Sequence, residues 1–424
     1  DPLNARLRPR GPIPLKRRVD YMQLYDKDLL SMQEVRELVE AAKEAQKELA
    51  NMSQSQVDHI VRAIADAGVR NARRLAEMAH EDTGFGKVED KIIKNIFGSR
   101  GVYEYVKDMK TVGELERDEE KKVRTIAVPV GVIAGLVPST NPTSTALYKA
   151  EIAIKAGNAI VFSPHPTALR CISETVKVIR QAISEAGGNE NLVSCITIPT
   201  MEATDNLMRH RDVAMILATG GSAMVRAAYS SGTPAIGVGP GNGPAYLEKT
   251  CDLPLAVKRI MDSKTFDNGT ICASEQSIIC DEDMVPAVRA EMEKQGAYFL
   301  NESEREKLGR YILRANGTMN PEIVGRSVET IARLAGLTDV PATARVLVAA
   351  EDGVGRGHPY SNEKLAPILA FYTGTDYKDV CEKVCTILRY EGAGHTFSMH
   401  TKNDEMVDYF AKRVPASRIM VNTP

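Results

Sequence analysis

The strongest constraint on the fold is an alternation of short apolar runs with helical segments. Apolar, β-branched runs occur at residues 124–139, 159–163, 192–198 and 213–219, and the segments between them have helical periodicity. Strands and helices that alternate at this spacing predict a doubly wound parallel sheet, and therefore the α/β fold class. Such sheets bind ligands beyond the carboxyl ends of their strands.

Upstream of this alternation, the chain has a helical pattern from Ser31 to about residue 81. Ser31 is expected to cap a helix that places Val35, Leu38 and Val39 on one face. The first 20 residues instead contain four prolines and six basic side chains without apolar periodicity. This composition predicts an extended arm or linker, with a solvated tail as the alternative.

Length and charge limit the classes of protein that need to be considered. A chain of 424 residues predicts two or three domains, on the usual scale of roughly 100 to 200 residues per domain. It has 54 basic and 56 acidic side chains, so its net charge of -2 favours neither nucleic acid nor an anionic membrane. No apolar run reaches the roughly 18 residues of a membrane span.

Cysteine usage indicates a reducing compartment. The seven cysteines are an odd number scattered along a long chain, unlike the dense framework of a small secreted domain. Cys381 and Cys385 have helical spacing, but no neighbouring histidine or cysteine pair completes a zinc set. We therefore expect a cytoplasmic protein without a metal site.

Two glycine-rich segments follow predicted strands. TGGS at 219–222 lies between a strand and a helix, where free backbone amides can face a phosphate, although a simple tight turn is the more common reason for such a segment. GVGPGNGP at 237–244 lacks the Lys-Ser or Lys-Thr of a P-loop and leads into a poor helix start. A kinase or nucleotide hydrolase is therefore disfavoured.

The segment TFDNGTICASEQSIIC at 265–280 contains Cys272 and Cys280 but no histidine. A free cysteine is more often a small buried residue than a nucleophile. On these residues alone, both interpretations of Cys272 stay open.

Six motifs together carry a family resemblance. In order they are GVIAGLVPSTNPTST, AGNAIVFSPHPTA, ATGGSAMV, GVGPGNGPAYL, DNGTICASEQS and NEKLAPILAFY. Their order and spacing resemble the aldehyde dehydrogenase superfamily, and in particular its coenzyme A-acylating branch. The similarity covers roughly residues 30 to 424.

The resemblance implies a three-part architecture. A basic, proline-rich arm or linker would occupy residues 1–29, and a dinucleotide-binding domain residues 30–240. An oligomerisation arm at about 112–128 would interrupt that domain. A catalytic α/β domain with Cys272 would occupy residues 241–424. A homodimer or homotetramer is the expected assembly.

The resemblance also assigns the chemistry. Cys272 matches the family nucleophile, which adds to an aldehyde carbonyl and becomes a thioester, whereas Cys280 has no such match. Asn141 matches the side-chain donor to the oxyanion, together with the Cys272 backbone N–H. Val238 occupies the position where hydrolytic members have a glutamate base for water. A thiol can replace water as the acceptor, so coenzyme A is the implied cosubstrate.

The cofactor contacts follow from the same motifs. The residues that match them are Ser163, His165, Thr219, Gly220, Gly221, Ser222 and Glu363. The first two lie where hydrolytic members have a lysine near the adenosine ribose, so NAD is expected but NADP stays open. His165 could equally cap a turn, and an isolated Glu363 would usually be a solvated charge.

The leading prediction is an NAD(P)-dependent, coenzyme A-acylating dehydrogenase for a small aldehyde of the acetaldehyde or propionaldehyde class. The alternatives are a hydrolytic or specialised semialdehyde dehydrogenase and a non-enzymatic dinucleotide-binding protein. The basic arm resembles the linkers that follow encapsulation helices in such enzymes. Contacts with a bacterial microcompartment shell or with other cargo are therefore part of the expectation.

Overall fold

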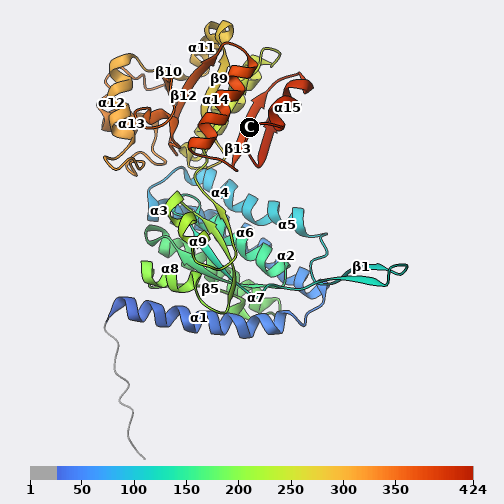
Figure 1. Cartoon of the computed structure of the whole chain (residues 1–424). Coiled ribbons are helices and arrows are strands. Elements are labelled where there is room, and N and C mark those ends of the chain that lie inside the picture. Colours follow the sequence, from blue (N-terminus) through green and yellow to red (C-terminus); the bar gives the residue numbers. More distant parts are fainter. Residues whose placement is uncertain (1–25, 424) are drawn as a thin grey trace, which may run out of the picture.

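The computed structural model describes residues 26–423, so nearly all of the predicted arm at 1–29 lies outside the described residues. Two parallel sheets lie in separate halves of the molecule, and a two-stranded hairpin projects from one of them (Figure 1). The predicted α/β class is confirmed. The sheets change between Val238 and Gly243, while the assignment of domains to 30–240 and 241–424 stays a prediction.

The first half is built on a five-stranded parallel sheet in the order β5-β4-β3-β6-β7. Every residue of the two central strands β3 and β4 is buried, because helices cover both faces of the sheet. The strand order reverses between β3 and β6, which is where doubly wound sheets bind ligands. The strands are β3 (Val132–Val137), β4 (Ala159–Pro164), β5 (Val193–Cys195), β6 (Val213–Thr219) and β7 (Ala235–Val238).

Amphipathic helices surround this sheet. In α2, Ser53 and Gln56 form a capping box, and Val57, Ile60 and Ile64 are buried on one face. The α-helices are α1 (Lys27–Leu49), α2 (Gln54–Arg70), α3 (Ala72–Thr83), α4 (Val88–Ile96), α5 (Val102–Val106), α6 (Pro142–Lys155), α7 (Leu169–Glu185), α8 (Met201–Met208) and α9 (Ser222–Tyr229). The shorter turns are η1 (Phe97–Gly101), η2 (Pro166–Ala168) and η3 (Glu190–Leu192).

The first helix begins earlier than the sequence predicted. Helix α1 starts at Lys27, because an Asp26 carboxylate oxygen accepts hydrogen bonds from the backbone N–H groups of Asp28 and Leu29. Ser31 is therefore not the cap. It is buried inside the helix, and its Oγ donates to the carbonyl of Asp28.

The projecting hairpin consists of β1 (Gly113–Asp118) and β2 (Val123–Ala127), paired antiparallel. It extends sideways from the first half of the molecule (Figure 1). The side chains of Leu115, Val123 and Ile126 are exposed on it. The hairpin lies within the stretch 112–128 that the sequence marked as an arm.

The second half is built on a seven-stranded parallel sheet in the order β10-β11-β12-β9-β8-β13-β14. Its strands are β8 (Gly243–Leu247), β9 (Glu275–Asp281), β10 (Ala297–Phe299), β11 (Val346–Ala350), β12 (Ile368–Gly374), β13 (Thr396–His400) and β14 (Arg418–Val421). Its helices are α10 (Leu253–Thr265), α11 (Val285–Lys294), α12 (Glu302–Ile312), α13 (Val328–Ala335), α14 (Tyr377–Tyr390) and α15 (Asp404–Ala411). Its shorter turns are η4 (Phe266–Gly269), η5 (Glu282–Met284) and η6 (Pro359–Ser361).

Buried charges join the two halves. The carboxylate of Asp267, in η4, is fully buried, and the ammonium groups of Lys91 and Lys94, both from α4, lie 3.0 Å and 2.5 Å from its Oδ2. Buried charges are stable only when they are paired, so this cluster fixes the approach of the catalytic segment to the first half.

Candidate active site

A cleft of about 430 Å³ opens beyond the carboxyl ends of the five-stranded sheet. It lies at the point where the strand order reverses, and the segments that follow β3, β4, β6 and β7 line it. The structure brings together eight of the nine predicted site residues there: Asn141, Ser163, His165, Thr219, Gly220, Gly221, Cys272 and Glu363. Ser222, the first residue of α9, is not among the residues that line the cleft, although Met224 of the same helix is.

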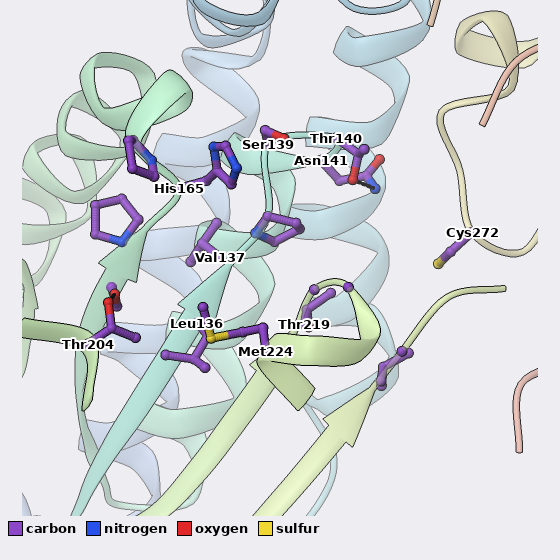
Figure 2. Close-up of a pocket in the computed structure, with 18 of the residues that line it drawn as sticks. Leu136, Val137, Ser139, Thr140, Asn141, His165, Thr204, Thr219, Met224 and Cys272 are labelled. Carbon is purple, nitrogen blue, oxygen red and sulfur yellow. Dashed lines mark hydrogen bonds between the residues drawn. The ribbon is translucent and has the colours of Figure 1, made fainter. Parts of the chain in front are cut away.

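Cys272 lies in the loop between η4 and β9 and reaches the cleft from the second half of the chain. Figure 2 shows its sulfur pointing toward the space between Asn141 and Thr219. The residue is partly exposed, whereas Cys280 is completely buried within β9. Of these two cysteines, only Cys272 can meet a substrate in the cleft, in agreement with the assignment from the motif.

The Cys272 thiol is protonated at neutral pH in the absence of ligands. Burial and, after it, the nearby carboxylate of Glu363 raise its pKa to about 11, while Lys94 and Arg418 oppose the shift. The buried Cys280 thiol has its pKa raised to about 12, mainly by desolvation. Positive charge near Cys272 is therefore needed to form the thiolate.

Asn141 follows β3 and precedes Pro142, the first residue of α6. In the described structure its side chain makes no capping bond to that helix. The Asn141 Oδ1 instead accepts a hydrogen bond from Lys94 Nζ at 2.7 Å, and the Nδ2 donates to Thr140 Oγ1 at 3.1 Å. The amide is thus oriented by contacts that leave one N–H free.

The turn before Cys272 requires an unusual backbone. Asp267 and Asn268 both have positive φ angles, of 48° and 51°. Asp and Asn tolerate this left-handed region better than most residues. The Asp267 carboxylate accepts bonds from the Lys87 backbone N–H and the Thr270 hydroxyl at 2.7 Å and 2.6 Å, and Asn268 Nδ2 donates to the carbonyl of Gly325.

Glu363 is a buried carboxyl group at the wall of the cleft. Its Oε1 accepts a hydrogen bond from the backbone N–H of Gly241 at 2.8 Å. Burial raises its pKa to about 8, and the neighbouring Glu391 adds to the shift. Glu363 is therefore a fixed part of the site, and the alternative of a solvated surface charge is wrong.

The loop at 219–221 fits a dinucleotide phosphate. Gly221 precedes α9, and within the described chain no side chain caps the first N–H groups of that helix. Uncapped N–H groups at a helix start can receive an anion. A side chain at Gly221 would meet open space, so the cleft is unobstructed there.

The two residues expected near the adenosine have additional structural roles. The Ser163 hydroxyl is buried and lies 2.8 Å from Thr204 Oγ1. His165 Nδ1 accepts from the backbone N–H of Thr167, so it does cap the turn η2 while it lines the cleft. Burial lowers the pKa of His165 from its usual value.

Comparison with known proteins identifies the family. The profile of the Aldehyde dehydrogenase family matches residues 14–307. The chain belongs to the aldehyde dehydrogenase family. Over 394 residues, it is 44% identical to the bifunctional aldehyde-alcohol dehydrogenase of Escherichia coli. The matched region covers 92% of this chain but 44% of that protein. It therefore spans less than half of the length of that relative.

Other relatives in the family match over most of their length. The acetylating succinate-semialdehyde dehydrogenase of Clostridium kluyveri is 38% identical, over 92% of this chain and 85% of that protein. The structure of a probable aldehyde dehydrogenase from Listeria monocytogenes is 62% identical with a TM-score of 0.93, covering 94% and 88% of the two chains. The propionaldehyde dehydrogenase of Rhodopseudomonas palustris with bound propionyl-CoA is 30% identical with a TM-score of 0.81, covering 92% and 85%.

Sequence reasoning missed Lys94 and Asp267 in this aldehyde dehydrogenase site. Helix α4 buries Lys91, Lys94 and Asn95 while it exposes Ile93 and, beyond its end, Phe97. Its polar face therefore points inward, opposite to the usual arrangement. A pattern that treats lysines as solvated does not identify Lys94, and so it does not identify the buried partner Asp267 either.

Within residues 26–423, no helix is long and apolar enough to cross a membrane.

Proposed function

We propose that this chain catalyses the NAD(P)-dependent, coenzyme A-acylating oxidation of a small aldehyde of the acetaldehyde or propionaldehyde class. One observation carries the proposal. Among the cleft-lining residues that the structure describes, Glu363 is the one acidic side chain, and Val238 lies where a water-activating glutamate would be needed. The acetylating activity named for the Clostridium kluyveri relative and the propionyl-CoA bound to the Rhodopseudomonas palustris enzyme support the same conclusion.

In the first step, the Cys272 thiolate adds to the aldehyde carbon and forms a C–S bond. The carbonyl oxygen becomes an oxyanion, which receives the free N–H of Asn141 Nδ2 and the backbone N–H of Cys272. Lys94 and Arg418 favour the thiolate by their positive charge. The product is a tetrahedral thiohemiacetal on the cysteine.

Loss of hydride from the thiohemiacetal carbon restores the C=O bond and leaves a thioester on Cys272. When bound, the nicotinamide cofactor supplies the hydride acceptor. Thr219, Gly220 and Gly221 would hold its pyrophosphate through backbone N–H groups, and Glu363 its nicotinamide ribose. Ser163 and His165 would face the adenosine side.

The thioester is then transferred to coenzyme A. The thiolate of coenzyme A attacks the thioester carbonyl, and the Cys272 sulfur leaves as a thiolate. The net change is aldehyde, oxidised cofactor and coenzyme A to acyl-CoA, reduced cofactor and one proton. The same groups serve the reverse reaction.

A hydrolytic dehydrogenase is the second candidate, and one observation favours it. The pKa of Glu363 is raised to about 8, which suits a general base for water. Against this role, its Oε1 already accepts the Gly241 N–H. A hydrolytic enzyme would form acid from aldehyde without coenzyme A, and Glu363→Gln would abolish that activity.

The experiment that separates the two candidates follows reduced cofactor with and without coenzyme A. We expect a single burst without coenzyme A, and sustained turnover with acyl-CoA as the product when it is present. Formation of free acid at the same rate in both cases would overturn the acylating proposal.

The assembly and the location are further proposals. We propose a homodimer or homotetramer in which the hairpin β1–β2 docks on a second copy, because it exposes Leu115, Val123 and Ile126. The free state of all seven cysteines supports a cytoplasmic location. We also propose a location inside a bacterial microcompartment, with the residues that precede α1 as the linker toward shell or cargo. Mass photometry and co-purification with shell proteins test these two points.

A further inference from the structure

The ammonium of Lys94 lies at the junction of the two halves with all three of its N–H groups engaged. It donates to Asn141 Oδ1 at 2.7 Å, to Asp267 Oδ2 at 2.5 Å and to the Thr270 carbonyl at 2.9 Å. The side chain is 8% exposed. Asn141 belongs to the first half, whereas Asp267 and Thr270 belong to the segment that leads to Cys272.

This contact determines which way the Asn141 amide faces. An ammonium has donors and no acceptor, so the oxygen of the amide must point toward Lys94. The nitrogen of the amide then faces away from Lys94. One of its hydrogens goes to Thr140 Oγ1, and the other is free for the cleft.

The same ammonium sets the distance between the oxyanion donor and the nucleophile. Thr270 is two residues before Cys272, and its hydroxyl also donates to the Asp267 carboxylate. A group that binds both Asn141 and the Thr270 carbonyl therefore positions the oxyanion donor and the loop of the nucleophile around the reacting carbonyl. Removing it would release the amide and the cysteine loop from one another.

We propose that Lys94 is a positioning residue, which orients the Asn141 amide and holds it in register with the Cys272 loop. The proposal rests on the proposed function only in that the site stabilises an oxyanion on Cys272. It does not depend on whether coenzyme A or water later receives the acyl group.

The charge balance around Lys94 supports a functional role. Burial lowers its pKa to about 8, and Asp267 opposes that shift. An ammonium in this place is therefore costly, and an apolar side chain would pack there without that cost. The costly charge lies where it contacts the Asn141 amide.

Lys91 provides the matched control. It lies one helical turn earlier, is 3% exposed, and its Nζ donates to the same Asp267 Oδ2 at 3.0 Å. Among the described residues, it makes no hydrogen bond to Asn141. Loss of Lys91 therefore disturbs the buried pair without releasing the amide.

The test is a double-mutant cycle between position 94 and Asn141→Ala. The quantity measured is the single-turnover rate of reduced cofactor formation without coenzyme A, because it reports thioester formation alone. In the wild-type background, Lys94→Met should lower this rate by about tenfold or more, as expected for loss of oriented oxyanion stabilisation. In the Asn141→Ala background, it should lower the rate at least about threefold less, and the loss that remains reports the weaker support of the Cys272 thiolate.

Lys91→Met should behave differently in the same cycle. Its effect should be equal in both backgrounds within about twofold, as for a residue that acts independently of Asn141. Equal losses for Lys94→Met in the two backgrounds would overturn the proposal, as would an unchanged rate in Lys94→Met alone. Cofactor binding by fluorescence should be unaltered in all variants.

Lys94→Gln is measured in the same cycle. It takes the place of Lys94→Met if that variant does not fold. Circular dichroism identifies the variant that keeps the native fold. If the acyl group proves to go to water, the proposed function fails while the rates in this cycle still report on Lys94. If the enzyme makes acyl-CoA but Lys94→Met causes the same fold-loss of rate with and without Asn141, the role of Lys94 alone is overturned.

Discussion

The α-carbon of Gly241 lies directly against the backbone of Cys272. A Cβ atom added to Gly241 would be 1.8 Å from the Cys272 carbonyl oxygen and 2.7 Å from its carbonyl carbon. The glycine-rich segment at 237–244 therefore packs against the cysteine loop at Gly241. Its resemblance to a phosphate loop comes from a different requirement, which is close approach of two backbones.

Gly241→Ala should displace the nucleophile without removing it. Because the obstructing atoms belong to the backbone, the Cys272 loop must move, and a shift of this size can cost about 100-fold in turnover. Gly239→Ala is the matched control, since no described atom lies within 4 Å of a Cβ built there. Steady-state kinetics of the two variants check this, and comparable activities would contradict it.

Cys272→Ala should abolish aldehyde oxidation while the cofactor still binds, because the nucleophile is lost and the five-stranded sheet is intact. Cys280→Ala should retain most activity, since this thiol is completely buried in β9. It should instead lower the melting temperature, as removal of a packed sulfur leaves a small cavity. Reduced cofactor formation and thermal unfolding distinguish the two, and exchanged phenotypes would mean that the wrong cysteine was chosen.

The sequence predicted the parts of this molecule that depend on local patterns. Strands β3, β4, β5 and β6 followed from runs of apolar residues, whereas β7 was not predicted. Cys272, Asn141 and the 219–221 loop followed from motifs that combine unusual residues at fixed spacing. Lys94 could not be predicted in this way. Its partners Asn141 and Asp267 are 47 and 173 residues away in the chain, and it lies on a helix whose polar face is buried.

Two other differences have the same physical origin. Ser31 has the residue type of a helix cap, but Asp26 provides the cap one turn earlier and Ser31 instead lies 2.7 Å from the Thr200 hydroxyl. Ser222 has the right motif, but as the first residue of α9 it is not among the residues that line the cleft, whereas Met224 of the same helix is. Local patterns identify the element, whereas tertiary contacts decide its end.

Glu363→Gln should lower the pKa of the Cys272 thiol. The carboxylate is the second contribution, after burial, to the raised pKa of about 11, and it is ionised above its own pKa of about 8. The variant should therefore be alkylated faster by iodoacetamide at about pH 9, by about tenfold for each unit that the thiol pKa falls. Mass spectrometry of the Cys272 peptide across pH provides the measurement. If the pH dependence of Cys272 alkylation were the same in the variant and the wild type, the predicted coupling would be contradicted.

Glu151→Gln should change how stability depends on pH. Glu151 is fully buried in α6, and neither carboxyl oxygen has a hydrogen-bond partner among the described residues. Burial raises its pKa to about 9, so its contribution to stability is complete below the unfolded pKa and is lost as the pH rises toward 9. The gain of the neutral variant over the wild type should grow by at most about 1.4 kcal/mol per pH unit in that range. Urea unfolding at several pH values checks this, and a constant difference would contradict it.

The last prediction tests whether the residue at 238 decides the fate of the thioester. Val238 is the final residue of β7, lines the cleft and is 42% exposed. A glutamate there would keep contact with solvent, so its pKa should stay low enough for it to act as a base near neutral pH. A well-placed base contributes about 100- to 10,000-fold, so Val238→Glu should divert acyl groups from coenzyme A to water.

The measurement for Val238→Glu is the ratio of free acid to acyl-CoA at fixed aldehyde and cofactor concentrations. Val238→Gln is the matched control, because it has nearly the same size and cannot act as a base. We expect the ratio to rise in the glutamate variant alone. If the two variants gave equal ratios, the carboxylate would have no access to the thioester, and the absence of a base at this position could no longer explain why the acyl group goes to coenzyme A.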